Sequence, residues 1–282
     1  MMSASFMLSA PSNESCPANS ECALTVNCRC EDPDGPRGLS SSVRAREMNA
    51  SHSLTVQDME RPRSPDEFYN WVMGKCEELG ATLEAKAFAR SGAVLPKKFY
   101  DELFPLAIFV RREYSGRHDV RITPNLGSEN FDATISIGVS GDEKILVEIT
   151  CSKDGYDDSL RMEYLTKHGH VNLTGPVSVT GRRGAKDRSV NVESEAADHS
   201  SLVERQLSML RERIEAKASK HYGANHTLLV AVDDYFPLRE EEDAQKINKF
   251  VSGLLPQLDL DFARVVIAGV AGKIFLSYRL EI

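Results

Sequence analysis

The sequence predicts an α/β fold in which a central mixed β-sheet is flanked by helices. Three observations lead to this prediction. Apolar residues recur at helical spacing up to about residue 114, they alternate as in strands between residues 120 and 152, and helical and strand patterns then follow one another to the C-terminus. The order of helices, three strands, helix, strand, helix and two strands is typical of helices packed on a mixed sheet.

The composition bounds the class of protein. The chain has 282 residues, of which 41% are hydrophobic and 27% charged, and its formal net charge is -8. This acidic balance argues against a protein that coats nucleic acid non-specifically, although it leaves room for a local basic patch. No apolar run is long enough to span a membrane and no secretory signal is present, so we expect a cytoplasmic protein.

Residues 1–63 are expected to form a disordered N-terminal extension, and residues 64–282 a single α/β domain. The extension is rich in Ser, Pro, Asn and Gly, so it cannot bury enough apolar surface to offset the entropy of ordering. Its cysteines follow a C-x5-C-x5-C-x-C spacing that lacks the close pairs of zinc sites, and we interpret them as reduced thiols. They are Cys16, Cys22, Cys28 and Cys30.

Ordered structure is expected to begin with a helix at Ser64. Pro65 suits the first turn, Glu67 completes a capping box with Ser64, and Gly80 is a fitting end. Two further helices follow, and Pro105 should kink the longer one. They cover residues 81–89 and 96–114.

The next segment alternates between apolar and polar side chains, which predicts three strands over residues 120–123, 131–139 and 144–152. A short turn makes the last two strands a hairpin, and we expect it to place Val139 opposite Glu143. In that register Asp132 and Glu148 become diagonal neighbours on the face away from the apolar residues, with β-carbons roughly 7 Å apart.

Residues 153–197 interrupt this pattern and are predicted to be an insert. Within it, residues 176–180 and 189–192 resemble two short strands around a basic tip, which predicts a basic hairpin insertion. Cationic groups at such a tip can contact DNA phosphates; a solubilising turn is the alternative. The basic residues are Arg182, Arg183, Lys186 and Arg188.

The C-terminal part is predicted to begin with a helix that runs from a second capping box at Ser201 to near Gly223. Gln206, Arg213 and Lys217 lie at the edge of its apolar face. The elements after it are a strand over residues 227–232, a helix over 240–255 and strands over 263–269 and 274–280.

The two acids of the hairpin are the first candidates for chemistry. Carboxylates on neighbouring strands can reach one divalent cation, and hard oxygen ligands suit Mg²⁺ or Mn²⁺. We therefore expect Asp132 and Glu148 to be metal ligands. The alternative is that they are ordinary polar residues on the outer face of a sheet.

This arrangement resembles the PD-(D/E)xK nuclease superfamily over about residues 97–235. The resemblance rests on Asp132 in Asn130-Phe131-Asp132-Ala133-Thr134-Ile135, on Glu148 in Val147-Glu148-Ile149-Thr150-Cys151-Ser152-Lys153, and on the order of the elements. It implies a restriction-endonuclease-like core and a hydrolase that cuts DNA phosphodiester bonds with Mg²⁺ or Mn²⁺. DNA is then the expected partner, and a homodimer is one expected assembly.

The sequence departs from the family at the lysine, because Thr150 stands where the resemblance places it. Lys153 could reach back to assist the nucleophile, and Gln206 would position water or a lysine. The alternative function is a catalytically inactive nuclease-fold module that binds nucleic acid or a protein partner. Threonine in place of lysine is the feature that favours this alternative.

Other residues are weaker candidates. The resemblance allows Glu102 or Glu113 of the long helix as a further metal ligand. His168 and His170 could approach a zinc ion but lack a third ligand nearby, and Asp233-Asp234 could line a cleft at the end of a strand. The sequence contains none of the common phosphate-loop, dinucleotide-binding, serine-hydrolase or zinc-protease motifs.

Overall fold

The computed structural model describes residues 54–138, 140–182, 185–235, 238 and 241–280. Contacts divide the chain into residues 1–38 and residues 39–282, and every described residue belongs to the second unit. Most of the expected N-terminal extension therefore lies outside the described residues, together with its four cysteines.

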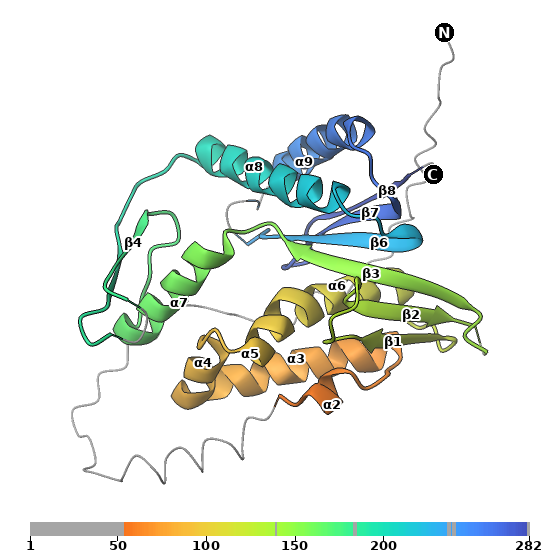
Figure 1. Cartoon of the computed structure of the whole chain (residues 1–282), viewed down its shortest axis with the longest axis horizontal. Helices are drawn as coiled ribbons and strands as arrows, with labels where there is room; N and C mark the ends of the chain where they lie inside the picture. The colour runs from red at the N-terminus through yellow and green to blue at the C-terminus, as the bar shows by residue number, and fades with distance from the viewer. Residues whose placement is uncertain (1–53, 139, 183–184, 236–237, 239–240, 281–282) are drawn as a thin grey trace. The chain divides into compact units, whose positions relative to one another are not determined.

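The second unit is built on a six-stranded mixed sheet (Figure 1). Its strands are β1 (Val120–Pro124), β2 (Ala133–Ile137), β3 (Glu143–Cys151), β6 (Gly223–Val232), β7 (Phe262–Gly269) and β8 (Phe275–Arg279). They lie side by side in the order β1-β2-β3-β6-β7-β8. The first three are antiparallel, β3, β6 and β7 run parallel, and β8 is antiparallel to β7.

Helices cover both faces of the sheet, which confirms the predicted α/β class (Figure 1). The main helices are α3 (Pro65–Ala81) and α6 (Phe104–Tyr114) on one face, and α8 (His199–Ala218) and α9 (Glu241–Leu254) on the other. Two apolar cores result, because alternate side chains of a strand point to opposite faces. Val147 and Ile149 belong to the core beside α3 and α6, whereas Leu228 and Val230 belong to the core beside α8 and α9.

The folded part begins before the expected boundary at residue 63. A short helix, α2 (Val56–Met59), precedes α3, and Leu54 and Met59 are buried in the first core. Arg63 then forms an isolated β-bridge with Ile122 of β1. The few apolar side chains of this segment find partners in the domain, which composition alone does not show.

The predicted capping box of α3 is confirmed. Ser64 Oγ accepts a hydrogen bond from the amide of Glu67, and the Glu67 carboxylate accepts one from the amide of Ser64. The helix ends at Ala81 rather than Gly80, and α4 (Leu83–Ala89) follows it.

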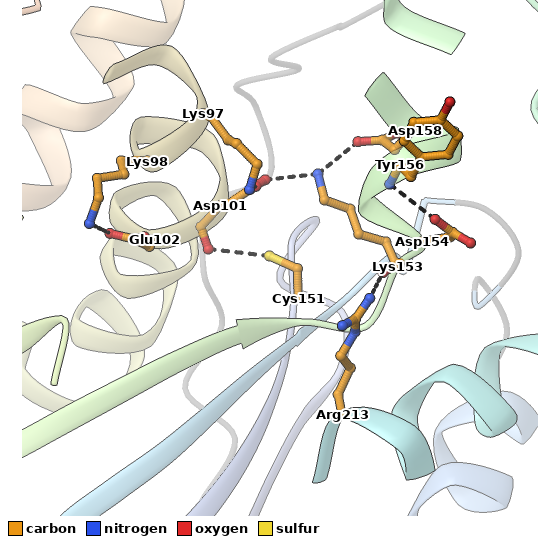
Figure 2. A network of polar contacts seen from close by, with 10 residues as sticks. All are labelled: Lys97, Lys98, Asp101, Glu102, Cys151, Lys153, Asp154, Tyr156, Asp158 and Arg213. Carbon is orange, nitrogen blue, oxygen red and sulfur yellow. Dashed lines mark hydrogen bonds and ion pairs between the residues drawn. The ribbon is translucent and has the colours of Figure 1, made fainter. Parts of the chain in front are cut away.

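The predicted helix over residues 96–114 contains a π turn. Its parts are α5 (Val94–Lys98), η1 (Phe99–Leu103) and α6. Pro105 has no amide hydrogen, so it cannot donate to the carbonyl of Asp101 four residues earlier. Cys151 at the end of β3 donates to that carbonyl instead, with an Sγ–O distance of 3.2 Å (Figure 2). This contact sets Asp101 and the adjacent Glu102 beside the end of β3.

The hairpin between β2 and β3 has a different register from the predicted one. Ile137 pairs with Glu143 and Ala133 pairs with Val147, so the predicted pairing of Val139 with Glu143 is wrong. Val139 itself lies outside the described residues. The loop is longer than the predicted turn, and the strands are shifted by two residues. An even shift keeps each side chain on its predicted face.

The insert contains a helix that the sequence pattern did not predict. α7 (Gly155–His168) is capped by Asp154 and carries few apolar residues, so its helical period is weak. The two short strands of the insert are present as β4 (Val177–Thr180) and β5 (Ser189–Val192). They pair with each other and contact α7.

α8 begins before the capping box predicted at Ser201. Its N-cap is Asp198, whose carboxylate accepts a hydrogen bond from the amide of Ser201 (3.0 Å). The predicted apolar face is confirmed by the burial of Val203, Leu210 and Ile214. Among the helices that the structure describes, none has the length and apolar character that crossing a bilayer requires.

Candidate functional site

Asp132 stands directly before β2, and the charge of Glu148 on β3 acts on it. The ladder of β2 and β3 ends where Ala133 pairs with Val147. Because the predicted register is wrong, the predicted diagonal arrangement of the two acids is not confirmed. The amide of Asp132 donates to the carbonyl of Val147 (2.8 Å), and the amide of Ile149 donates to Oδ2 of Asp132 (2.7 Å). The backbone of β3 thus fixes Asp132 through one carboxylate oxygen.

Glu148 is 8% exposed, and both of its polar contacts fall on the same oxygen. Lys217 of α8 forms an ion pair with Oε1, and the hydroxyl of Tyr222 donates a hydrogen bond to Oε1 (3.2 Å). Tyr222 in turn stacks on Phe262, with ring centroids 4.4 Å apart. Among the described residues, Oε2 of Glu148 has no hydrogen-bond partner.

Glu102 of η1 is the third carboxylate near this pair. Lys98 of α5 forms an ion pair with its Oε2 at 3.3 Å (Figure 2). The charge of Asp132 acts on Glu102, and the charge of Lys98 acts on Asp132, so these groups lie within electrostatic reach of one another. We call Glu102, Asp132 and Glu148 the acid cluster.

Burial and mutual repulsion raise two pKa values in the acid cluster. Burial raises the pKa of Asp132 to about 6, and the nearby charge of Glu148 adds to the effect. Burial also raises the pKa of Glu102 to about 7, with the charge of Asp132 as the second cause. The cluster holds more negative charge than Lys98 and Lys217 neutralise, which favours the binding of a further cation.

The acid cluster offers the type of donor atom that a divalent metal ion binds. Each carboxylate keeps one oxygen without a hydrogen-bond partner among the described residues: Oε1 of Glu102, Oδ1 of Asp132 and Oε2 of Glu148. None of these three oxygens is fully buried. Among the described residues, the fully buried side-chain nitrogen and oxygen atoms that lack a hydrogen-bond partner belong to Arg161 and His226. Carboxylate oxygens are the ligands that Mg²⁺ and Mn²⁺ prefer.

The three carboxylates do not converge on one point as metal ligands do. Within the described ranges, no three His, Cys, Asp or Glu side chains stand in a metal-binding arrangement. A metal ion at this site would therefore have to bring the free oxygens of the acid cluster toward one another.

Lys153 is engaged outside the acid cluster. Its ammonium group is held between Asp101 and Asp158, each at 2.8 Å (Figure 2). Burial alone would lower the pKa of Lys153, but these two carboxylates outweigh burial and raise it. Lys153 ties the π turn to α7, and the structure does not bring it to Asp132 or Glu148 as the sequence led us to expect.

Gln206 also has a different role from the expected one. Its side-chain amide donates to the carbonyl and the hydroxyl of Ser152, at 2.7 and 3.0 Å, and it is only 4% exposed. Arg213, two turns later on α8, donates to the carbonyl of Lys153 (2.6 Å). These contacts fasten α8 to the end of β3.

Two other lysines stand next to the acids. Thr150 is half-buried and uncharged, and the nearest ammonium groups come from Lys217 and Lys98. The sequence pattern placed Lys217 only at the flank of a helix and did not single out Lys98, because both contacts arise from tertiary packing. The spacing of Lys98 and Glu102, four residues apart on one predicted helix, was the available signal.

Two aromatic residues behind Glu148 were also missed. His226 packs edge-on against Tyr222, with ring centroids 5.6 Å apart, and is 3% exposed. Burial lowers the pKa of His226, so its ring is neutral at neutral pH. Neither ring nitrogen has a partner among the described residues. In the sequence, nothing distinguishes this pair from ordinary core residues.

The remaining acid and histidine candidates are accounted for separately. Glu113 pairs with Arg264 of β7 (2.7 Å), so it is neutralised away from the acid cluster. Asp234 accepts hydrogen bonds from backbone amides of the turn between β7 and β8. His168 and His170 are exposed near the end of α7, and no third potential metal ligand joins them in the described part of the chain.

The basic residues of the insert are divided between two environments. Arg188 forms a two-point ion pair with Glu163 of α7, at 3.0 and 3.1 Å. Arg182 and Lys186 are exposed, and Arg183 lies outside the described residues. The insert therefore presents fewer uncommitted cations than its sequence indicates.

Comparisons with protein-family models, with curated proteins and with solved structures found no match to this chain. The resemblance to the PD-(D/E)xK superfamily therefore stays a prediction.

Proposed function

We propose that the domain is a metal-dependent nuclease that hydrolyses DNA phosphodiester bonds at the acid cluster. One observation carries the proposal. Asp132 is held by the amide of Ile149, the residue after Glu148, and each of the two acids keeps one carboxylate oxygen free of partners among the described residues. The raised pKa of Asp132 supports it, because perturbed carboxylates are concentrated at functional sites.

Asp132 and Glu148 would hold Mg²⁺ or Mn²⁺, with Glu102 as a third carboxylate. Such an ion lowers the pKa of a bound water and offsets charge on a phosphate. The Ile149 amide orients the free oxygen of Asp132, and the Tyr222 hydroxyl does the same for Glu148. These contacts restrict the movement of the two acids, and a bound ion would still have to draw the free oxygens together.

Lys217 takes the part that the resemblance assigns to a lysine at position 150. Its ammonium group already lies at Glu148, where it can turn to the phosphate and stabilise developing negative charge. Threonine at position 150 cannot supply that charge. Lys153 and Gln206 act through structure, by holding the end of β3 to its neighbours.

The test is cleavage of plasmid and oligonucleotide DNA with Mg²⁺ or Mn²⁺. Asp132→Asn and Glu148→Gln should each abolish cleavage while the protein stays folded, because each removes a charged ligand without changing the shape of the side chain. Glu113→Gln is the matched control, since that acid is paired with Arg264 and should leave cleavage unchanged. Cleavage that survives both changes in the acid cluster would exclude this mechanism.

A catalytically inactive module that binds nucleic acid is the second candidate function. Two observations favour it: Thr150 carries no charge, and the Lys217 ammonium already neutralises Glu148. In this case the protein would bind DNA without cutting it. Asp132→Asn would leave DNA binding unchanged, whereas exchange of Arg182 and Lys186 for Gln would weaken DNA binding. The basic hairpin insertion would then be the DNA-binding element.

Location and assembly are part of the same proposal. A cytoplasmic protein is consistent with Cys76 and Cys151, which form no disulfide among the described residues. A homodimer is a further expectation, and light scattering of the purified chain at several concentrations would test it.

A further inference from the structure

A groove of about 230 Å³ runs between α8 and the junction of β3 with α7. It lies at the same end of β3 as the Lys153 contacts in Figure 2. The three residues of the acid cluster are not among those that line it. Its lining residues are Lys153, Asp154, Arg205, Ser208, Met209, Glu212 and Arg213.

Two of its cations are held in place by the protein. Arg213 donates to the carbonyl of Lys153 (2.6 Å), which uses only part of its donor capacity. The Lys153 ammonium is clamped between Asp101 and Asp158. A ligand that meets these groups has less side-chain ordering to offset, and such preorganisation strengthens binding.

Arg205 and Arg213 are the cations of the groove that form no ion pair with a described residue. Arg205 is exposed and forms no ion pair with a described residue. Asp154 is committed to α7, because its Oδ1 accepts the amides of Tyr156 and Asp157. Glu212 is exposed. Lys153 is already paired with Asp101 and Asp158, so the two arginines are the donors that remain open to a ligand, and they share the groove with Asp154 and Glu212.

These cations continue a row that begins at the acid cluster. Lys217 lies at Glu148, Arg213 precedes it by four residues on α8, and Arg205 precedes Arg213 by eight. With a rise of about 1.5 Å per residue, the three positions lie roughly 6 and 12 Å apart along the helix. A polymer with regularly spaced negative charges can contact all three.

We propose that this groove binds the sugar-phosphate backbone of a nucleic acid strand beside the bond held at the acid cluster. The inference rests on the proposed function for the identity of the strand and extends it by placing that strand along α8. Arginine suits this role, since its guanidinium presents several donors to phosphate oxygens.

The experiment measures binding without cleavage. A fluorescent single-stranded DNA of about 20 nucleotides is titrated with the full chain in EDTA, at several salt concentrations. Arg205→Gln should weaken binding about tenfold at low salt and lower the slope of log affinity against log salt by roughly 0.7. Glu212→Gln should strengthen binding, because it removes a repelling charge.

Arg211→Gln is the matched control. Arg211 lies on the same helix, but it packs over Phe250 of α9 and near Glu215, outside the groove. It should leave affinity and salt slope nearly unchanged. Equal losses in the two arginine variants, or no binding by the unaltered chain, would overturn the inference. If Arg205→Gln weakens DNA binding but the unaltered chain never cuts DNA, the groove proposal stands and the nuclease proposal is excluded.

Discussion

Lys217 on α8 forms an ion pair with Oε1 of Glu148 on β3. Both side chains are largely buried, with 17% and 10% of their surface exposed, so the pair is only weakly screened by water. The ammonium group supplies positive charge where a divalent cation would otherwise supply it. Metal binding and the ion pair therefore compete for one carboxylate.

Lys217→Met should raise the affinity for Mn²⁺ by at least about tenfold, because removing a like charge beside the bound cation relieves on the order of a few kcal/mol. It should also lower the free energy of unfolding without metal by about 3 kcal/mol, since Glu148 is left buried without its partner. Calorimetric titration and urea unfolding measure the two effects. Lys220→Met, an exposed lysine just beyond the same helix, is the control. An unchanged Mn²⁺ affinity would contradict the competition.

Titration of Asp132 and Glu102 should lower the free energy of unfolding as the pH rises from about 4 to about 7. The pKa values of Asp132 and Glu102, about 6 and about 7, lie above their ordinary values of 3.8 and 4.5. In that window these two side chains hold more protons in the folded protein than in the unfolded chain, so their contribution to the free energy of unfolding decreases with pH. Thermal or urea unfolding across this range measures the decrease, and Mg²⁺ should reverse part of it at pH 8.

Asp132→Asn separates the acid cluster from other titrating groups. The amide cannot ionise, but its oxygen can still accept the hydrogen bond from Ile149. At pH 8 the variant should be more stable than the unaltered chain by on the order of 2 kcal/mol, and at pH 4 the two should be similar. Asp259→Asn, an exposed acid outside the cluster, should show no such pH-dependent gain. A variant that is less stable at pH 8 would show that Asp132 is structural.

The sequence was sufficient for those features that depend on local pattern. The capping box at Ser64 located the start of α3, and strict alternation located β2 and β3 and the faces of their side chains. Asp132 and Glu148 were paired for that reason. The register was not predictable in the same way, because it depends on the conformation of a loop whose length the turn residues do not define.

Other features depend on tertiary contacts that no local pattern reports. α7 is mostly polar, so its helical period is weak and the segment was interpreted as irregular. Lys153 was expected at the acids because it is close to Glu148 in the sequence, but Asp101 and Asp158 hold it elsewhere. Tyr222 reaches Glu148 across two elements that are far apart in the chain.

Gln206→Ala should destabilise the domain without altering its chemistry. The buried amide donates twice to Ser152, and its loss leaves the Ser152 carbonyl without that partner, which costs about 1–3 kcal/mol of unfolding free energy. Urea unfolding and metal affinity are measured together. Gln245→Ala on α9 is an exposed control that should leave both unchanged. If Gln206→Ala abolished DNA cleavage without changing the stability of the protein, the result would support the expected direct role of Gln206 in positioning water.

Asp234 and Gly269 form a second coupled pair, remote from the proposed chemistry. The Asp234 carboxylate accepts hydrogen bonds from the amides of Ala271, Lys273 and Ile274, and it does so directly against the Cα of Gly269. A side chain at position 269 would collide with that carboxylate. The glycine is therefore required by a close approach of a side chain to the backbone.

Gly269→Ala should lower the free energy of unfolding by about 2 kcal/mol or more, because either the new methyl group or the Asp234 carboxylate has to move. Asp234→Ala should cost about 3 kcal/mol through the loss of three hydrogen bonds to a buried charge. In the double variant the collision is gone, so the two losses should not add, and urea unfolding of all four proteins gives the coupling energy. Strictly additive losses would mean that the backbone at Gly269 relaxes away from Asp234, and that the turn is not held by this contact.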